Sequence, residues 1–180
     1  SGSYAGVWDT RGPSFHIDSK VERLNIHQGN VKDMKVAMTY ETGKLDVMAT
    51  VENEQMQGGV LLAYDLSDSL NFLSTRGQLR IDELAAFGLD IKGGQEALET
   101  SFEIIHAGQE NKSFTNLSLT DFKYTCDTAT FTIDKISMED NQKGDHNTTT
   151  LKSDVVDLFI SGNFRELRPA PFVFRLMQNY

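Results

Sequence analysis

The stretch GKLDVMATV, residues 43–51, alternates apolar and polar side chains along its whole length. In a strand, successive side chains point to opposite faces, so this alternation predicts a half-buried β-strand. Its apolar face carries Leu45, Val47, Ala49 and Val51. After a polar interval and Gly58-Gly59, the run VLLAY at 60–64 predicts a second strand antiparallel to the first. No motif in this pair carries chemistry, so it predicts architecture before function.

The composition is that of an ordinary globular domain. The chain has 180 residues, of which 39% are hydrophobic and 24% are charged. A chain of this length is long enough to bury a sizeable core in one domain. No window reaches the ~18–20 consecutive apolar residues of a membrane-spanning helix, which argues against a membrane protein.

The charge and the cysteine count exclude several classes of protein. The net charge of −9 and the absence of a Lys/Arg run argue against a domain whose main task is to neutralise phosphate. Cys126 is the single cysteine, which excludes an internal disulfide and a cysteine-rich zinc site and favours a reducing compartment. The start at Ser1 shows no Met and no secretory signal, so it is read either as a tag scar or as the end of a chain cut from a precursor.

The sequence predicts three parts. Residues 1–14 are small and polar and are expected to form an N-terminal arm, in which Trp8 stands out as an anchor. Residues 15–168 are expected to form the folded domain. Residues 169–180 contain two prolines, which predict an extended C-terminal tail.

Within the domain, strand patterns outnumber helical ones. The apolar positions of Val31–Tyr40 predict a short helix that gives way to a strand, and Asp82–Gly88 predicts one or two helical turns with Asp82 as N-cap and Gly88 as the stop. Loops are expected at 106–116 and 138–152, because both segments are polar. A turn at 127–128 or a bulge near Asp134 is expected between the alternations on either side. An antiparallel sandwich is the economical fold.

Three stretches of the chain resemble the jelly-roll capsid proteins of picorna-like plant viruses, the comovirus, nepovirus and cheravirus group. They are 37–64 with GKLDVMATV and GGVLLAYD, 98–108 with LETSFEIIHAG, and 155–171 with VVDLFISGNFRELRPAP. They stand in the family's order, and the size of the chain is most similar to that of one of the three small cheravirus capsid proteins.

The resemblance implies an all-β fold: an eight-stranded antiparallel jelly-roll sandwich with one or two short helices. It implies a capsid subunit, cut from a polyprotein at Ser1 and Tyr180, that assembles in the host cytoplasm into an icosahedral virion. Its partners would be the other capsid proteins of the same virus and the encapsidated single-stranded RNA, which an acidic chain would contact weakly. No enzymatic activity, cofactor, metal or membrane is expected.

Four residues at the two ends are candidate subunit contacts, because they are large and apolar or aromatic without a local partner: Trp8, Phe172, Phe174 and Tyr180. Packing against their own domain explains them about equally well. The four histidines are scattered without metal-ligand spacing, and Cys126 is interpreted as a small buried apolar residue. The alternative function is a soluble β-sandwich that binds a carbohydrate or a protein, for which the termini would be dispensable.

Overall fold

The computed structural model describes residues 1–9, 12–66, 71–89, 94–109, 111–127 and 129–163. They form eleven β-strands and one short 3₁₀ helix, η1 (Leu84–Phe87). The strands are β1 (Gly2–Asp9), β2 (Gly12–Ile26), β3 (Gly29–Glu41), β4 (Lys44–Glu52), β5 (Met56–Asp65), β6 (Asn71–Ile81), β7 (Glu96–Gln109), β8 (Lys112–Cys126), β9 (Ala129–Lys143), β10 (His146–Ser153) and β11 (Asp157–Gly162).

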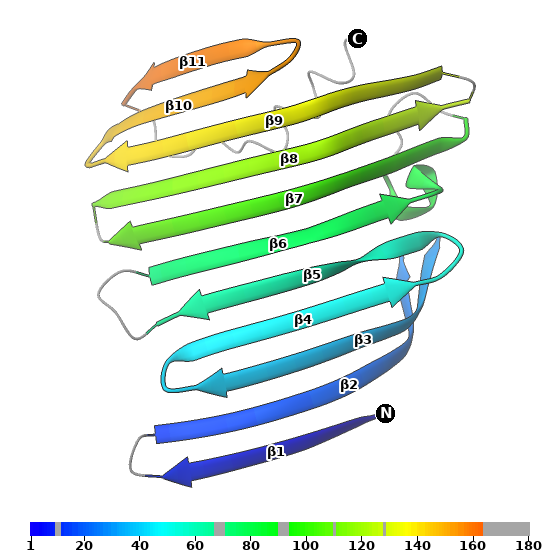
Figure 1. The fold of residues 1–180 in the computed structure, drawn as a ribbon, viewed down its shortest axis with the longest axis vertical. Coiled ribbons are helices and arrows are strands. Elements are labelled where there is room, and N and C mark those ends of the chain that lie inside the picture. Colours follow the sequence, from blue (N-terminus) through cyan, green and yellow to red (C-terminus); the bar gives the residue numbers. More distant parts are fainter. Residues whose placement is uncertain (10–11, 67–70, 90–93, 110, 128, 164–180) are drawn as a thin grey trace.

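The eleven strands form one antiparallel sheet in chain order, so that each strand pairs only with its neighbours in sequence (Figure 1). The all-β class and the antiparallel pairing are therefore confirmed. The eight-stranded arrangement of two sheets is not what the described residues form. A jelly roll needs long connections that pair distant strands, whereas here every strand pairs with its neighbours in sequence, in places through turns of only two residues. Thr42 and Gly43, both at positive φ, form one such turn.

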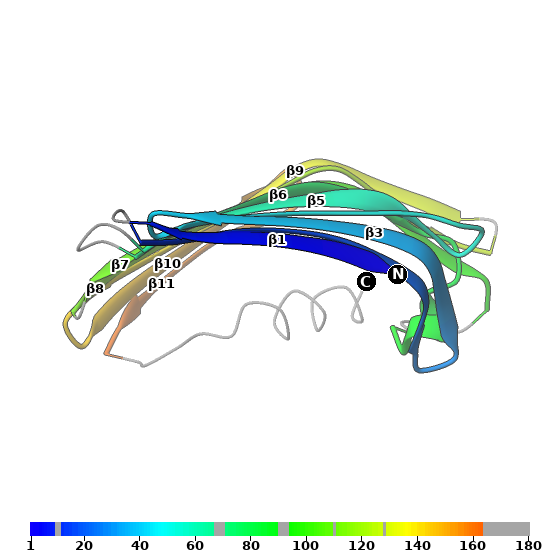
Figure 2. The same cartoon turned by 90° about the horizontal axis from the view of Figure 1, so that it is seen from below.

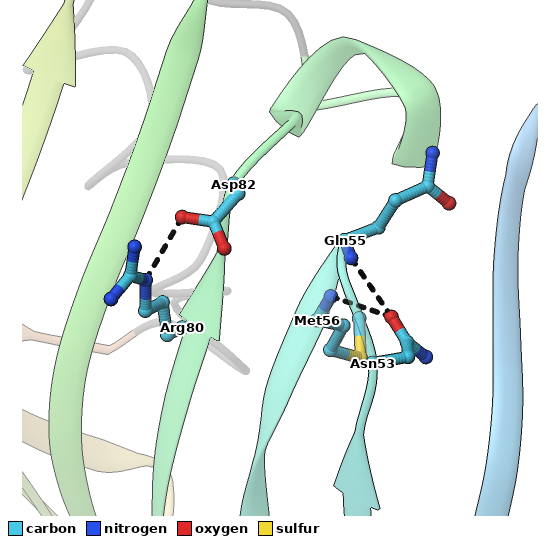
Figure 3. Close-up of polar contacts among 5 residues, drawn as sticks. All are labelled: Asn53, Gln55, Met56, Arg80 and Asp82. Atoms are coloured by element: carbon cyan, nitrogen blue, oxygen red, sulfur yellow. Dashed lines mark hydrogen bonds and ion pairs between the residues drawn. The ribbon is translucent and has the colours of Figure 1, made fainter.

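The strand pair on which the fold prediction depends is confirmed. β4 and β5 are antiparallel, with Leu45 opposite Tyr64, Val47 opposite Leu62 and Ala49 opposite Val60. Gly58 and Gly59 lie inside β5 rather than in a turn. The polar interval before them is a tight turn, in which the Asn53 side chain accepts hydrogen bonds from the backbone N–H groups of Gln55 and Met56, both at 2.9 Å (Figure 3).

For Val31–Tyr40 the predicted short helix is wrong and the strand predicted after it is confirmed, because the whole segment belongs to β3. Asp33 adopts φ 56° and interrupts the regular pairing with β2. This irregularity shifts the inward-facing positions from Val31 to Met34, a spacing of three that imitates a helical period. The Asp33 carboxylate lies 2.6 Å from the Lys20 ammonium, which lowers the pKa of Asp33.

The two predicted polar loops are also wrong. Residues 106–116 contain the end of β7 and the start of β8, and 138–152 contain most of the β9–β10 hairpin. Threonine and asparagine fill strand positions here because their neighbours across the sheet are polar as well: the Thr149 hydroxyl donates to the Asp140 carboxylate. Cys126 pairs with Ala129, so β8 and β9 form the hairpin that the predicted turn between them requires.

The helical turn predicted after Asp82 is present as η1. Gly88 ends it in the left-handed conformation, at φ 75°, as expected. Asp82 is not its N-cap: Glu83 holds that position, and Asp82 instead accepts a hydrogen bond from Arg80 Nε at 2.9 Å (Figure 3).

The sheet is bowed, and its two faces differ (Figure 2). η1 lies on the hollow side, where Leu84 and Phe87 pack against Ile81 and Val31. The side chains that share a face with Ile81 through the strand register therefore form the concave face. Two apolar clusters lie on this face, one around η1 and one centred on Phe122, Ile133, Ile136, Met138 and Leu151.

Candidate functional site

The concave face carries an extensive apolar surface among the described residues. Fifteen inward positions of β3 to β6 carry no charged side chain, and all are half-buried. They are Val36, Met38, Tyr40, Leu45, Val47, Ala49, Val51, Gly58, Val60, Leu62, Tyr64, Leu73, Thr75, Gly77 and Leu79. Covering such a surface is favourable by roughly 25 cal/mol per Å² of apolar area removed from water.

The bow of the sheet makes its backbone concave on this side, and we call this concave face the trough (Figure 2). The strands curve along their own length, so the hollow runs across them, from β1 toward β11 (Figures 1 and 2). Neighbouring strands lie ~4.8 Å apart, so eleven strands give a trough about 48 Å long.

Glycine keeps the floor of the trough smooth at two places. A Cβ at Gly77 would lie 2.9 Å from the ring of Phe102, which sits opposite it on β7. A Cβ at Gly58 would lie 2.3 Å from the carbonyl oxygen of Gln78. The backbone N–H and C=O groups of the interior strands are hydrogen-bonded to the neighbouring strands. The trough therefore offers apolar contact and no backbone donors or acceptors.

One side of the trough, at the strand ends between β6 and β7, is bordered by the corner around η1 (Figure 1). Phe87 lies directly over Gly29, where a Cβ would be only 2.6 Å from the ring. Gln55 ties three segments together: its Oε1 accepts from Asn30 N–H at 2.9 Å, and its Nε2 donates to the Glu83 carboxylate at 2.9 Å. This corner is therefore rigidly connected to the β2–β3 and β4–β5 turns.

Beyond β6, the concave face carries two hydrogen-bonded pairs of polar side chains, both between β7 and β8. His106 Nδ1 and the Thr115 hydroxyl oxygen lie 2.9 Å apart, near the ends of β7 and β8 that are farther from η1. Nearer to η1, the Tyr124 hydroxyl donates to the Glu96 carboxylate at 2.6 Å, and Glu96 is 2% exposed. Burial, followed by this hydrogen bond, raises the pKa of Tyr124 well above its usual range.

The convex face is mixed in polarity, since Phe72 is 40% exposed there, and it contains a shallow depression. Small side chains create it, since Ala37, Ala63 and Ser74 lie among longer neighbours that include Met48 and Leu61.

The residues singled out in the sequence do not gather at one place in the described chain. Trp8 pairs with Pro13 at the end of β1, and Ser1 pairs with Lys20. Cys126 lies half-buried at the end of β8, opposite Glu96. The other candidate contacts, Phe172, Phe174 and Tyr180, lie outside the described residues, as does the tail at 169–180.

The histidines are far apart and have separate partners. His16 contacts Thr39 and Asp18, and His146 contacts Ser161 and Asn163. Among the described residues, no group of three or more His, Cys, Asp or Glu side chains is arranged to hold a metal ion. No helix within the described ranges is both long and apolar enough to cross a membrane.

Comparison with known proteins gave no match: no family model, no curated protein and no solved structure is similar to the chain.

Proposed function

We propose that the protein is a non-catalytic binding protein that holds hydrocarbon, such as the acyl chains of lipids, in the trough of its sheet. The observation that carries this proposal is the uninterrupted run of uncharged, half-buried inward positions from β3 to β6. A surface of this kind gains free energy when an apolar ligand covers it.

Hydrocarbon fits the trough better than an extended peptide does. A peptide strand lying on the face of a sheet would leave its own N–H and C=O groups without partners, at a cost of several kcal/mol per group. A sugar would lose hydrogen bonds to water in the same way. An acyl chain has no such groups. One leaflet of a bilayer is about 15 Å deep, half of the ~30 Å hydrocarbon core, and the four strands β3 to β6 span about 14 Å across the trough, so this run matches the length of one acyl chain.

Two adjacent leucines provide the test. Leu62 lies in the trough, whereas Leu61 points to the convex face and is 43% exposed. We expect Leu62→Gln to weaken binding of a fluorescent long-chain fatty acid about fivefold, the equivalent of ~1 kcal/mol of lost apolar contact. Leu61→Gln, the matched control, leaves the affinity unchanged.

Three results would overturn the proposal: no saturable binding of the probe by the full chain, an equal loss in both variants, or displacement of the probe only by an amphipathic helical peptide. The last result would assign the trough to a protein partner. The same result is expected if the apolar residues of 164–180 bind in the trough. Competition by an isolated 164–180 peptide would identify this case.

The sequence resemblance supports a second candidate, a capsid subunit in a shell around single-stranded RNA. Two of the three similar stretches lie in β4–β5 and β7. In such a shell, sister subunits would cover the apolar face, and the net charge of −9 makes strong RNA contact by this chain unfavourable. This candidate retains the jelly-roll prediction and therefore requires a second sheet. Icosahedral particles containing this chain with companion proteins would support it, and a monomer purified without companions would count against it.

A further inference from the structure

β1 forms one edge of the sheet, and its free side can be deduced from the hydrogen bonds it makes to β2. Lys20 N–H donates to the Ser1 carbonyl at 2.7 Å, so Ser1 and Lys20 are a hydrogen-bonded pair. Such pairs alternate along an antiparallel ladder. Ser3, Ala5 and Val7 therefore turn their backbone groups toward β2, and the even-numbered residues turn theirs away from the sheet: Gly2, Tyr4, Gly6 and Trp8.

This edge carries none of the features by which proteins usually prevent edge-to-edge pairing, which are Lys, Pro and bulges. The first eight residues contain no charged side chain and no proline. The register with β2 is regular from Gly2 to Asp9. Tyr4 is 89% exposed and Val7 is 65% exposed. By comparison, β11 at the opposite edge is shorter and begins with Asp157.

We propose that β1 is an assembly surface that pairs in antiparallel fashion with β1 of a second copy of this chain, which joins the two sheets into one. A residue of β1 whose backbone N–H and C=O groups point away from the sheet can pair only with a residue of the same kind in the partner strand. The register that fits the side chains places Tyr4 opposite the partner's Gly6, and Gly2 opposite the partner's Trp8, with Ala5 on the two-fold axis.

The sheet itself provides a precedent for this register. Phe102 lies over Gly77 on the neighbouring strand, so an aromatic ring covers the backbone where no side chain competes for the space. The alternative register, Tyr4 opposite itself, would place two rings at one position and would leave Gly2 opposite Gly6. In the proposed register each Tyr4 ring has a glycine to cover.

Pairing of this kind has a consequence for the trough. The two-fold axis stands perpendicular to the sheet, so the concave faces of both copies lie on the same side and the hollow becomes continuous across the dimer. The interface consists of one strand from each copy, which is small beside the ~1,600 Å² of a standard stable complex. We therefore expect a dimer whose population depends on protein concentration.

The first test is sedimentation velocity of the full chain over a range of concentrations. The wild type is expected to shift from monomer to dimer. Tyr4→Pro removes an outward N–H and is expected to abolish the shift while leaving thermal unfolding of the monomer unchanged, because no bond to β2 is lost. Tyr4→Phe is the matched control and keeps the dimer. A wild type that stays monomeric, or a Tyr4→Pro variant that still dimerises, would overturn the proposal.

The second test checks the register. Ala5 on the two-fold axis faces its own copy as a non-hydrogen-bonded pair, with Cβ atoms ~4.5–5.5 Å apart, close to disulfide range. In a Cys126→Ser background, Ala5→Cys is expected to form an intermolecular disulfide on mild oxidation. Val7→Cys, equally accessible on the same face of β1, is not. Cross-linking of Val7→Cys to an equal extent would contradict the register.

Discussion

Two adjacent glycines in β5 should respond to the same substitution in opposite ways. A Cβ at Gly58 would lie 2.3 Å from the Gln78 carbonyl oxygen, a backbone atom of the neighbouring strand that cannot rotate away. We expect Gly58→Ala to cost about 1–3 kcal/mol of unfolding free energy, as overpacked sites do. A Cβ at Gly59 would meet only ordinary contacts, the nearest 3.6 Å away, so Gly59→Ala should stabilise by ~0.4–1 kcal/mol through the unfolded state.

Thermal unfolding followed by far-ultraviolet circular dichroism measures the difference. For a chain of this length 1 kcal/mol shifts the midpoint by roughly 2–4 °C, so Gly58→Ala should unfold about 2–12 °C below the wild type and Gly59→Ala slightly above it. Because the two sites share one strand, differences in helix or strand propensity cancel. Equal destabilisation by both substitutions, or a Gly58→Ala variant as stable as the wild type, would refute the close approach of β5 to β6 and with it the register of the trough floor.

Three further predictions concern the corner and the polar groups. Phe87→Ala should cost about 3–5 kcal/mol in urea unfolding, because a side chain that is 6% exposed leaves a cavity over Gly29; a cost below ~1 kcal/mol would contradict the packing of the corner. Asn53→Ala should cost ~1–2 kcal/mol, since two backbone N–H groups lose their acceptor, and Asn53→Asp should recover most of it; no recovery would contradict the role of the acceptor. The pKa of Tyr124 is raised on folding, so above the ordinary tyrosine value of ~10 the unfolded state loses a proton that the folded state keeps. Stability should therefore fall as pH rises beyond that value, and less so in Tyr124→Phe. Ionisation of all five tyrosines together, seen by ultraviolet absorbance before unfolding, would contradict this.

The sequence predicted the fold where alternation is unbroken and failed where it is interrupted. β4 was recognised because its apolar residues keep a period of two, and β5 because 60–64 is a compact apolar run next to a turn signal. The irregularity at Asp33 replaced one step of two by a step of three, which is also the signature of a helix turn. In β9 and β10, hydrogen bonds between side chains across the sheet stabilise strands that contain few apolar residues, and polarity alone predicts a loop for such segments.

The candidate site was accessible to sequence reasoning only in part. Alternation assigned the inward residues of β4 to one face, but it could not show that nine further strands continue this face or that the sheet bows toward it. Nor could it show long-range packing such as that of Phe87 over Gly29, residues 58 positions apart. The prediction that Trp8 makes a subunit contact has not been tested. The proposed pairing of β1 with a second copy makes it specific, because it places Trp8 opposite Gly2 of the second copy.

The measurement that tests the central claim most directly is a methyl NMR titration of the full chain with a long-chain fatty acid. If hydrocarbon lies in the trough, the methyl signals of Val47, Val60 and Leu62 shift and saturate together. The methyl signals of Leu61, on the other face of the same strand, stay in place. Shifts at Leu61 without shifts at Leu62, or no shifts at any of these methyl groups, would contradict the account.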